Sequence, residues 1–275
     1  MHSSREPVVL LHSSGASGAQ WRALAGQLGE RYHVVAPDLY GYGAAAPWPG
    51  RGVFTLAHEA QIVYSLLDQI GEPAHVVGHS YGGAVALHVA RLHPERLRSL
   101  TLIEPVAFHL LSERAEITAV ADAVARAVAC GDYLGGFAAF VEYWSGPGSW
   151  EAIPAGKRAA MAARLPKVAL DFHATLHEPA RLADFYAMAV PTLLLRGALS
   201  PLPTRRICEL LAQALPDPRL VTLNDAGHMA PLTHASQVNA FIAAHLNSKG
   251  GRNETQQHRV VDSRRGLREY RTGTR

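Results

Sequence analysis

The sequence predicts an α/β fold in which helices cover both faces of a mostly parallel, six-stranded sheet. Short apolar runs rich in Val, Leu and Ile alternate with helical patterns along most of the chain. These runs are apolar throughout, as strands buried on both faces are. One segment, residues 106–187, breaks the rhythm: it has Ala-rich helical patterns but no convincing strand, which indicates an all-helical insertion.

The predicted elements follow one another in a regular order. Each strand is short and bounded by Gly, Pro or Asp, and most are followed by a helical stretch. The six strands are residues 8–11, 33–37, 75–78, 99–103, 192–195 and 220–223. The helices are residues 18–29, 55–70, 81–92, 203–214 and 234–246.

The composition indicates a folded chain with a buried core. Of the 275 residues, 48% are apolar and 18% are charged, which excludes wholesale disorder. No apolar run approaches the roughly 18 residues of a membrane span, and the first ten residues lack the apolar region of a signal peptide. Two cysteines 78 positions apart, Cys130 and Cys208, argue against a disulfide scaffold and favour a cytoplasmic location.

The basic charge of the chain is concentrated at its C-terminal end. Residues 248–275 contain eight basic and three acidic residues, whereas the whole chain has a formal net charge of +3. The body of the chain is therefore slightly acidic and shows no bias toward nucleic acid or membranes. The tail has few apolar residues, so we expect a disordered basic extension. A small molecule is the expected partner, and the sequence predicts no oligomeric state.

These patterns divide the chain into a core, an insertion and a tail. Residues 1–105 and 188–247 are expected to form the core, and residues 106–187 a helical cap. Ten of the twenty aromatic residues fall within the insertion. They can form a small core of the cap or line an apolar pocket beneath it, and we expect both to be partly true.

The segment Gly78–Gly82 reads G-H-S-Y-G and matches the pattern G-x-S-x-G. It lies where a predicted strand must turn directly into a predicted helix, the setting of a nucleophile elbow. Such a turn holds the serine in a strained conformation with its hydroxyl exposed, and the flanking glycines let strand and helix pack closely. Ser80 is therefore the candidate nucleophile. An incidental serine in a Gly-rich turn is the alternative.

With this motif the chain resembles the α/β-hydrolase superfamily, as a serine hydrolase with a helical cap, over about residues 8–247. Residues 12–15 (H-S-S-G) resemble the oxyanion loop usually written HG-x-G, and residues 38–43 (D-L-Y-G-Y-G) resemble the D-x-x-G-x-G turn. Pro94–Leu97 and Gly227–His228 stand where the superfamily has its next landmarks. The resemblance implies an α/β-hydrolase fold that lacks the first two N-terminal strands of many relatives.

The resemblance also assigns a base and an acid. His228 follows the last predicted strand, in the chain order serine, acid, histidine. The usual acid position holds Ser200, and a hydroxyl cannot supply the charge that stabilises an imidazolium. Glu104 ends an earlier strand at the same edge of the sheet, where some members, including many haloalkane dehalogenases, place the acid. A surface glutamate is the alternative reading, and Asp225 is a weaker candidate for the acid.

The resemblance implies an oxyanion hole made by backbone N–H groups of Tyr81 and of the loop after the first strand. Family spacing makes Ser14 the second donor. Ser13 replaces the customary glycine and is a further candidate. We expect His79, beside the nucleophile in sequence, to point away from it.

Two further patterns are discounted. Asp171, His173, His177 and Glu178 resemble a metal site only in part, because no third placed ligand accompanies the two histidines, so we expect a solvated helix face. The G-Y-G of residues 41–43 lacks the third glycine and the acidic partner of a dinucleotide site. No metal or organic cofactor is expected.

The sequence thus predicts a serine hydrolase that acts through an acyl-enzyme on a small, moderately apolar ester, lactone or related carbonyl compound. A C–C bond hydrolase and an acyltransferase are alternatives on the same three residues. A dehalogenase is disfavoured, because a serine replaces the aspartate that attacks the carbon–halogen bond. A hydrolase-fold binding protein whose catalysis has decayed is the alternative from another functional class.

Overall fold

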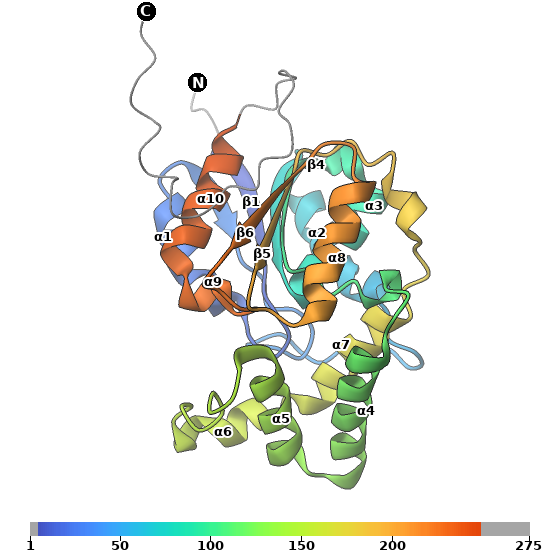
Figure 1. The fold of residues 1–275 in the computed structure, drawn as a ribbon. Coiled ribbons are helices and arrows are strands. Elements are labelled where there is room, and N and C mark those ends of the chain that lie inside the picture. Colours follow the sequence, from blue (N-terminus) through green and yellow to red (C-terminus); the bar gives the residue numbers. More distant parts are fainter. Residues whose placement is uncertain (1–4, 249–275) are drawn as a thin grey trace, which may run out of the picture.

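The computed structural model describes residues 5–248, which form a six-stranded sheet in which each strand runs parallel to its neighbours. The strands lie in the order β2-β1-β3-β4-β5-β6 (Figure 1). The predicted strands are all present: β1 (Glu6–Leu11), β2 (Tyr32–Val35), β3 (Ala74–His79), β4 (Leu97–Ile103), β5 (Thr192–Gly197) and β6 (Pro218–Leu223). The predicted fold class is confirmed.

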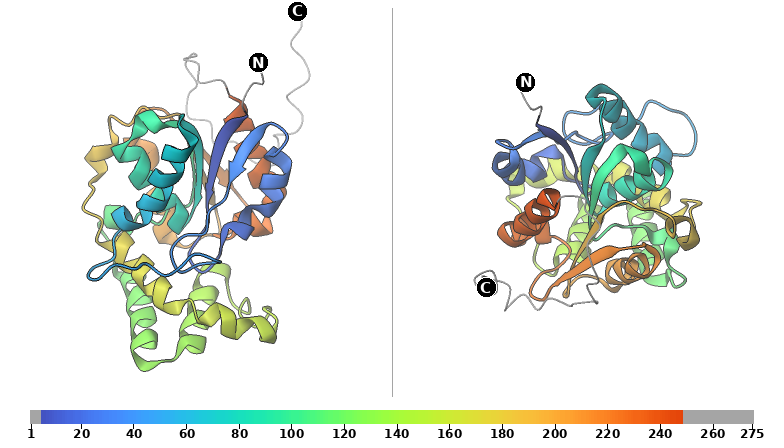
Figure 2. Two further views of the ribbon diagram at one scale, coloured as in Figure 1. Left: turned by 180° about the vertical axis from the view of Figure 1, so that it is seen from behind. Right: turned by 90° about the horizontal axis from the view of Figure 1, so that it is seen from above.

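Helices cover both faces of this sheet. Those outside the insertion are α1 (Arg22–Leu28), α2 (Leu56–Ile70), α3 (Tyr81–Leu92), α8 (Leu202–Ala214), α9 (Ala230–Thr233) and α10 (Ala235–Asn247). The view from above shows the sheet between α1 and α10 on one side and α2, α3 and α8 on the other (Figure 2). The predicted helices match, except that the first begins with a separate 3₁₀ turn, Gly18–Trp21.

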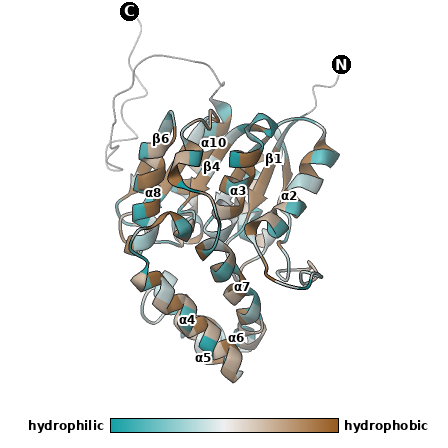
Figure 3. Cartoon of the chain, turned by 90° about the vertical axis from the view of Figure 1, so that its right-hand side faces the viewer, coloured by the Kyte–Doolittle hydropathy of each residue, from teal (hydrophilic) through white to brown (hydrophobic). Residues whose placement is uncertain are grey.

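The apolar strands supply the core on both faces, because successive side chains of a strand point to opposite sides. In β1, Val8 and Leu10 pack in the layer that α1 and α10 cover. Val9 and Leu11 pack in the larger layer beneath α2, α3 and α8. Figure 3 shows this concentration of hydrophobic residues in the strands. Burial on both faces explains why the strand sequences are continuously apolar.

The register of the strands aligns the carboxyl ends of β1, β3 and β4, so the loops that follow them begin side by side. Leu11 of β1 pairs with Gly78 of β3, and His79 of β3 pairs with Ile103 of β4. The residues that follow these strands therefore leave the same edge of the sheet side by side. The chain also changes direction between β1 and β3, since β2 lies on one side of β1 and β3 on the other. Ligands of open α/β sheets bind outside such a switch point.

The insertion lies at this carboxyl edge of the sheet (Figure 1). Its helices are α4 (Ala115–Cys130), α5 (Tyr133–Ser145), α6 (Ala155–Ala162) and α7 (Leu165–Leu176). Aromatic residues pack within it, for example Phe137 against Trp150 with ring centroids 6.1 Å apart. No helix among residues 5–248 is long and apolar enough to cross a membrane. The predicted basic tail, apart from Ser248, lies outside the described residues.

Candidate active site

Ser80 is the single residue between the end of β3 and the start of α3. Its backbone has φ 55° and ψ −115°, an uncommon conformation for a residue other than glycine. Two backbone hydrogen bonds hold the turn. The N–H of Ser80 donates to the carbonyl of Ile103, and the carbonyl of Ser80 accepts from the N–H of Val106. The strained strand–turn–helix geometry of a nucleophile elbow is thus present at the predicted position.

Glycines allow the close packing that this turn needs. A Cβ atom on Gly82 would lie 2.4 Å from the carbonyl oxygen of Leu11. A Cβ atom on Gly78 would lie 2.3 Å from the carbonyl oxygen of Gly82. The N–H of Gly82 instead donates to the carbonyl of His12 at 3.1 Å, which joins the elbow to the loop after β1. Both glycines of the motif are therefore required sterically, because a side chain at either position would overlap backbone atoms.

His228 lies in the loop between β6 and α9, and its side chain is only 2% exposed. Its Nε2 atom is 2.9 Å from Oγ of Ser80, and its Nδ1 atom is 2.6 Å from Oε2 of Glu104. With the proton on Nδ1, the imidazole donates to the carboxylate and accepts from the serine hydroxyl. The structure therefore brings together all three residues that the sequence nominates.

Glu104 follows β4 directly and has φ 44°, the only positive φ of a described non-glycine residue besides that of Ser80. Its Oε1 atom accepts from the N–H of Gly197 at 2.6 Å and from the Ser200 hydroxyl. Burial raises the pKa of this carboxyl, but the bonds from His228, Ser200 and Gly197 together outweigh it and hold the pKa below the usual value. Glu104 is therefore ionised at neutral pH.

The departure at the usual acid position has a structural explanation. The Ser200 hydroxyl donates to the carboxylate of Glu104, and Thr204 donates to the other oxygen of Glu104 at 3.0 Å. Asp225, the weaker candidate for the acid, is 66% exposed and lies 3.7 Å from Nε2 of His234. The imidazole of His228 instead contacts Glu104, so geometry favours Glu104 over Asp225 as its partner.

The loop after β1 places one of the two predicted serines at the pocket. Ser14 lines the pocket beside Ser80 and Tyr81. The N–H and the hydroxyl of Ser13 instead both donate to Oε1 of Gln20, at 3.2 and 2.9 Å. Ser13 is thus turned to the α1 side and is not a free donor, and its φ is negative, so glycine is not required there. Tyr81 is the first residue of α3, where its N–H has no intrahelical acceptor.

His79 has a role that the sequence did not indicate. As expected, it does not contact the Ser80 hydroxyl; its Nε2–H donates to the backbone carbonyl of His228 at 2.9 Å. Its Nδ1 then accepts from the side-chain amide of Gln20 at 3.1 Å. Burial, with the nearby imidazole of His228, lowers the pKa of His79 to about 3, so the ring stays neutral. Gln20 and His79 therefore fix the backbone of the histidine loop.

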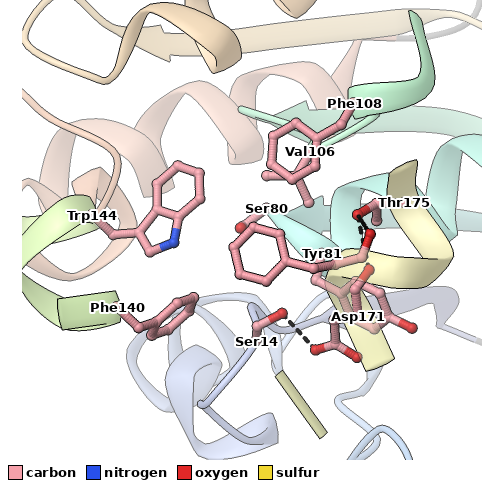
Figure 4. A pocket seen from close by; sticks show the side chains of 10 residues that line it. Ser14, Ser80, Tyr81, Val106, Phe108, Phe140, Trp144, Asp171 and Thr175 are labelled. Atoms are coloured by element: carbon pink, nitrogen blue, oxygen red, sulfur yellow. Dashed lines mark hydrogen bonds between the residues drawn. The ribbon is translucent and has the colours of Figure 1, made fainter. Parts of the chain in front are cut away.

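A pocket lies between the core and the insertion. Its lining comprises Ser14, Ser80, Tyr81, Val106, Phe108, Phe140, Trp144, Asp171, Phe172 and Thr175. Phe140 and Trp144 stand on one side of it, with Asp171 and Thr175 on the opposite side (Figure 4). The ring of Trp144 lies 4.2 Å from that of His228 between centroids. The cavity measures about 20 Å³, which is room for about one water molecule.

The expectation of a solvated helix face is wrong for two of the four residues, and the helix α7 itself ends at Leu176, before His177 and Glu178. Asp171 is 3% exposed and Glu178 is 8% exposed, whereas His173 and His177 are exposed. Hydrogen bonds compensate for the burial of Asp171, because its carboxylate accepts from the hydroxyl of Ser14 at 2.6 Å and from that of Tyr42 at 2.5 Å. Glu178 instead pairs with Arg91 and His88. No group of three metal-ligating residues is found among residues 5–248.

Asp171 belongs to a buried charge cluster. The Lys167 ammonium contacts the carboxylates of both Asp171 and Glu59, and the Tyr81 hydroxyl donates to Glu59 at 2.9 Å. Burial raises the pKa of Asp171 to about 6, with Lys167 opposing and Glu59 adding to this shift. No pattern in the sequence indicates this cluster, because its members come from three separate segments of the chain, α7, α2 and α3.

Comparison with known proteins agrees with this architecture. Residues 6–235 match the family model described as alpha/beta hydrolase fold. The chain is 30% identical to a pimeloyl-[acyl-carrier protein] methyl ester esterase of Aeromonas hydrophila, over 84% of this chain and 91% of that protein. It is 36% identical to lipase LipV of Mycobacterium tuberculosis, over 46% of this chain and 45% of the lipase, so it matches less than half the length of that relative.

A solved structure gives the same result. A hydrolase from Pseudomonas aeruginosa PA01 superimposes with a TM-score of 0.73 at 26% identity, over 89% of this chain and 91% of that one. The family match spans the sheet, the elbow and the histidine loop alike, and the esterase aligns along nearly its whole length. On these grounds the chain belongs to the alpha/beta hydrolase fold family.

Proposed function

We propose that this alpha/beta-fold hydrolase is a serine esterase that works through an acyl-enzyme. The observation that carries the proposal is the continuous contact from Ser80 Oγ to His228 Nε2, at 2.9 Å, and from His228 Nδ1 to Glu104 Oε2, at 2.6 Å. A serine hydroxyl is a weak nucleophile at neutral pH and needs such a base. The buried carboxylate supplies the charge that stabilises the imidazolium once it forms.

The reaction proceeds in two halves. Ser80 attacks the substrate carbonyl while His228 takes the hydroxyl proton, and the oxyanion that forms accepts hydrogen bonds from the N–H groups of Tyr81 and Ser14. His228 then gives its proton to the departing alcohol, which leaves an acyl group on Ser80. A water molecule, activated by the same imidazole, attacks the acyl-enzyme and releases the acid.

The pocket favours a small and moderately apolar substrate. Five of its ten lining residues are Val106 or aromatic residues without a hydroxyl, and the cavity is small. Its apolar wall suits a short acyl chain, and the aligned relatives named esterase and lipase support ester hydrolysis. A lactone is the cyclic form of the same chemistry and is a substrate within this proposal.

The proposed reaction needs no cofactor, because serine, imidazole and carboxylate supply the nucleophile, the base and the charge. A small molecule is the proposed partner. Cys130 and Cys208 carry free thiols, which supports the cytoplasm as the proposed location.

The test is covalent labelling of the nucleophile. The native protein is expected to react with a fluorophosphonate probe at Ser80 and to hydrolyse short p-nitrophenyl esters. Ser80→Ala abolishes both, whereas Ser65→Ala, which changes an exposed serine on α2, leaves both intact. Labelling that survives in the Ser80→Ala protein would refute the assignment of the nucleophile.

Acyl transfer to an alcohol is the second candidate, because the same serine, imidazole and carboxylate serve both reactions when an alcohol takes the place of water. Product analysis in the presence of added alcohol separates hydrolysis from transfer. A C–C bond hydrolase would cleave vinylogous diketones. A decayed binding protein would show no burst of acyl-enzyme formation.

A further inference from the structure

Hydroxyl groups that line the pocket already donate hydrogen bonds to acceptors within the protein. The Ser14 hydroxyl donates to Oδ2 of Asp171 at 2.6 Å. The Thr175 hydroxyl donates to the backbone carbonyl of Asp171 at 2.8 Å, and the Tyr81 hydroxyl donates to Glu59 at 2.9 Å. Figure 4 shows the first two of these bonds at the side of the pocket opposite Trp144.

A hydroxyl that already donates its one O–H in a hydrogen bond can only accept hydrogen bonds from other groups. Ser14 and Thr175 therefore offer oxygen lone pairs. Oδ2 of Asp171 already accepts from the hydroxyls of Ser14 and Tyr42, and Oδ1 contacts Lys167, so the remaining lone pair of Oδ1 is the acceptor site that an ionised Asp171 offers. Burial, opposed by Lys167, raises the pKa of Asp171 to about 6, so its carboxyl is mostly ionised in a neutral or mildly alkaline assay. This side of the pocket is thus an array of acceptors.

The charged residues beside the pocket also favour a substrate group that donates a hydrogen bond over one that carries a negative charge. The pocket lining contains Asp171 but no Lys, Arg or His. Lys167 contacts both Asp171 and Glu59, and its Nζ lies 4.6 Å from the centre of the Tyr81 ring. Two carboxylates against one ammonium leave this cluster with a net negative charge. A substrate carboxylate placed here would meet repulsion and no donor.

We propose that Asp171 determines specificity by accepting a hydrogen bond from a hydroxyl on the acyl group of the substrate, with Ser14 and Thr175 as further acceptors. The substrates are then esters of short hydroxylated acids, and acyl groups that end in a carboxylate are rejected. We assign the pocket to the acyl group because that group stays bonded to Ser80 while the alcohol leaves. This inference rests on the proposed esterase function and adds the substrate class.

The test compares three methyl esters with four-carbon acyl groups: methyl 3-hydroxybutyrate, methyl butyrate and monomethyl succinate. The measured quantity is kcat/KM, from acid release in a pH-stat at pH 8. A hydrogen bond to a charged group is worth a factor of about ten or more. The native protein is expected to prefer the hydroxybutyrate over the butyrate by about tenfold, and to hydrolyse the succinate about tenfold more slowly than the butyrate.

The variants test which residue sets these ratios. Asp171→Asn is expected to bring both ratios to within about threefold of one, because it removes the charge and most of the acceptor capacity at nearly constant size. Asp122→Asn, an exposed aspartate on the insertion helix α4, leaves them unchanged. Each ratio is measured on one preparation, so a partly unfolded variant does not bias it. If Asp171→Asn does not fold, Ser14→Ala and Thr175→Val each lower the hydroxyl preference without removing a charge.

The outcomes separate this inference from the proposed function. A native protein that is labelled by the fluorophosphonate but hydrolyses all three esters equally well overturns the inference and leaves the esterase standing. Ratios that persist in Asp171→Asn also overturn it. Absence of both labelling and turnover removes the proposed function, and the inference with it.

Discussion

Oε2 of Glu104 lies 2.6 Å from Nδ1 of His228, although 124 positions separate the two residues in the chain. The contact depends on register, since Glu104 directly follows Ile103, which pairs with His79 at the end of β3. The carboxylate is then fixed by donors from the end of β5 and the start of α8, among them the N–H of Gly197. The aligned strand ends thus bring the carboxylate and the imidazole together.

The first prediction concerns the position of the acid. Glu104→Gln is expected to lower kcat for p-nitrophenyl butyrate by about 10³- to 10⁴-fold, because the amide cannot stabilise the imidazolium. Ser200 contacts the same carboxylate, so adding Ser200→Asp to that variant places a carboxylate next to the vacated charge. We expect the double variant to recover at least tenfold of the lost kcat. A near-normal kcat in Glu104→Gln alone would assign the acid role to another group.

A second prediction concerns the packing of the elbow. Gly82→Ala would place a Cβ atom 2.4 Å from the carbonyl oxygen of Leu11. Strand and helix cannot separate without breaking core contacts, so we expect a loss of about 2 kcal/mol or more in the free energy of unfolding. Gly26→Ala on α1 is the matched control, since nothing lies within 4 Å of its Cβ position. It should stabilise by about 0.5–1 kcal/mol. Urea denaturation measures both, and equal effects of the two changes would contradict the steric argument.

The third prediction concerns access to the pocket. Trp144 covers the ring of His228, with 4.2 Å between centroids. Trp144→Ala is expected to raise the ratio of kcat/KM for p-nitrophenyl octanoate to that for the butyrate by about tenfold, because the removed indole leaves room for a longer chain. Tyr133→Ala, on the same helix and 38% exposed, serves as the control. An unchanged ratio would show that longer chains reach Ser80 by another route.

The fourth prediction follows from the raised pKa of Asp171. Burial, aided by the Glu59 carboxylate and opposed by Lys167, brings this pKa to about 6, above the usual 3.8. Between these two values the folded protein holds a proton that the unfolded chain has released, so this contribution to stability is present at low pH and is lost as the pH rises through about 6. Asp171→Asn removes this titration.

The melting temperature of the native protein relative to Asp171→Asn is therefore expected to fall between pH 4.5 and pH 7.5. Taking the difference between the two proteins cancels the titrating groups that do not interact with position 171. Those that face Asp171 are Lys167 on its own helix, Glu59 on α2, and the tyrosines Tyr42 and Tyr81. A difference that stays constant over this pH range would contradict the raised pKa.

The sequence by itself determined the element order, because burial on both faces makes the strands continuously apolar and a helical period separates them. It also indicated the elbow, since G-x-S-x-G at a strand-to-helix turn has a local steric cause. The element order and the elbow depend on local sequence, so local sequence is enough to find them. Glu104 and His228 were nominated through the resemblance to the superfamily, by their places after strands.

Only the tertiary structure decided which of these groups meet. It showed Ser13 bonded to Gln20, Asp225 exposed beside His234, and His79 bonded to the backbone of the histidine loop. It also moved Asp171 from an expected solvated face to the wall of the pocket. Such contacts join segments far apart in the chain, and a helical pattern of charges does not reveal whether another segment covers it. Burial is a property of the whole fold, so the pKa of Asp171 and the acceptor character of the pocket could not be predicted from the sequence.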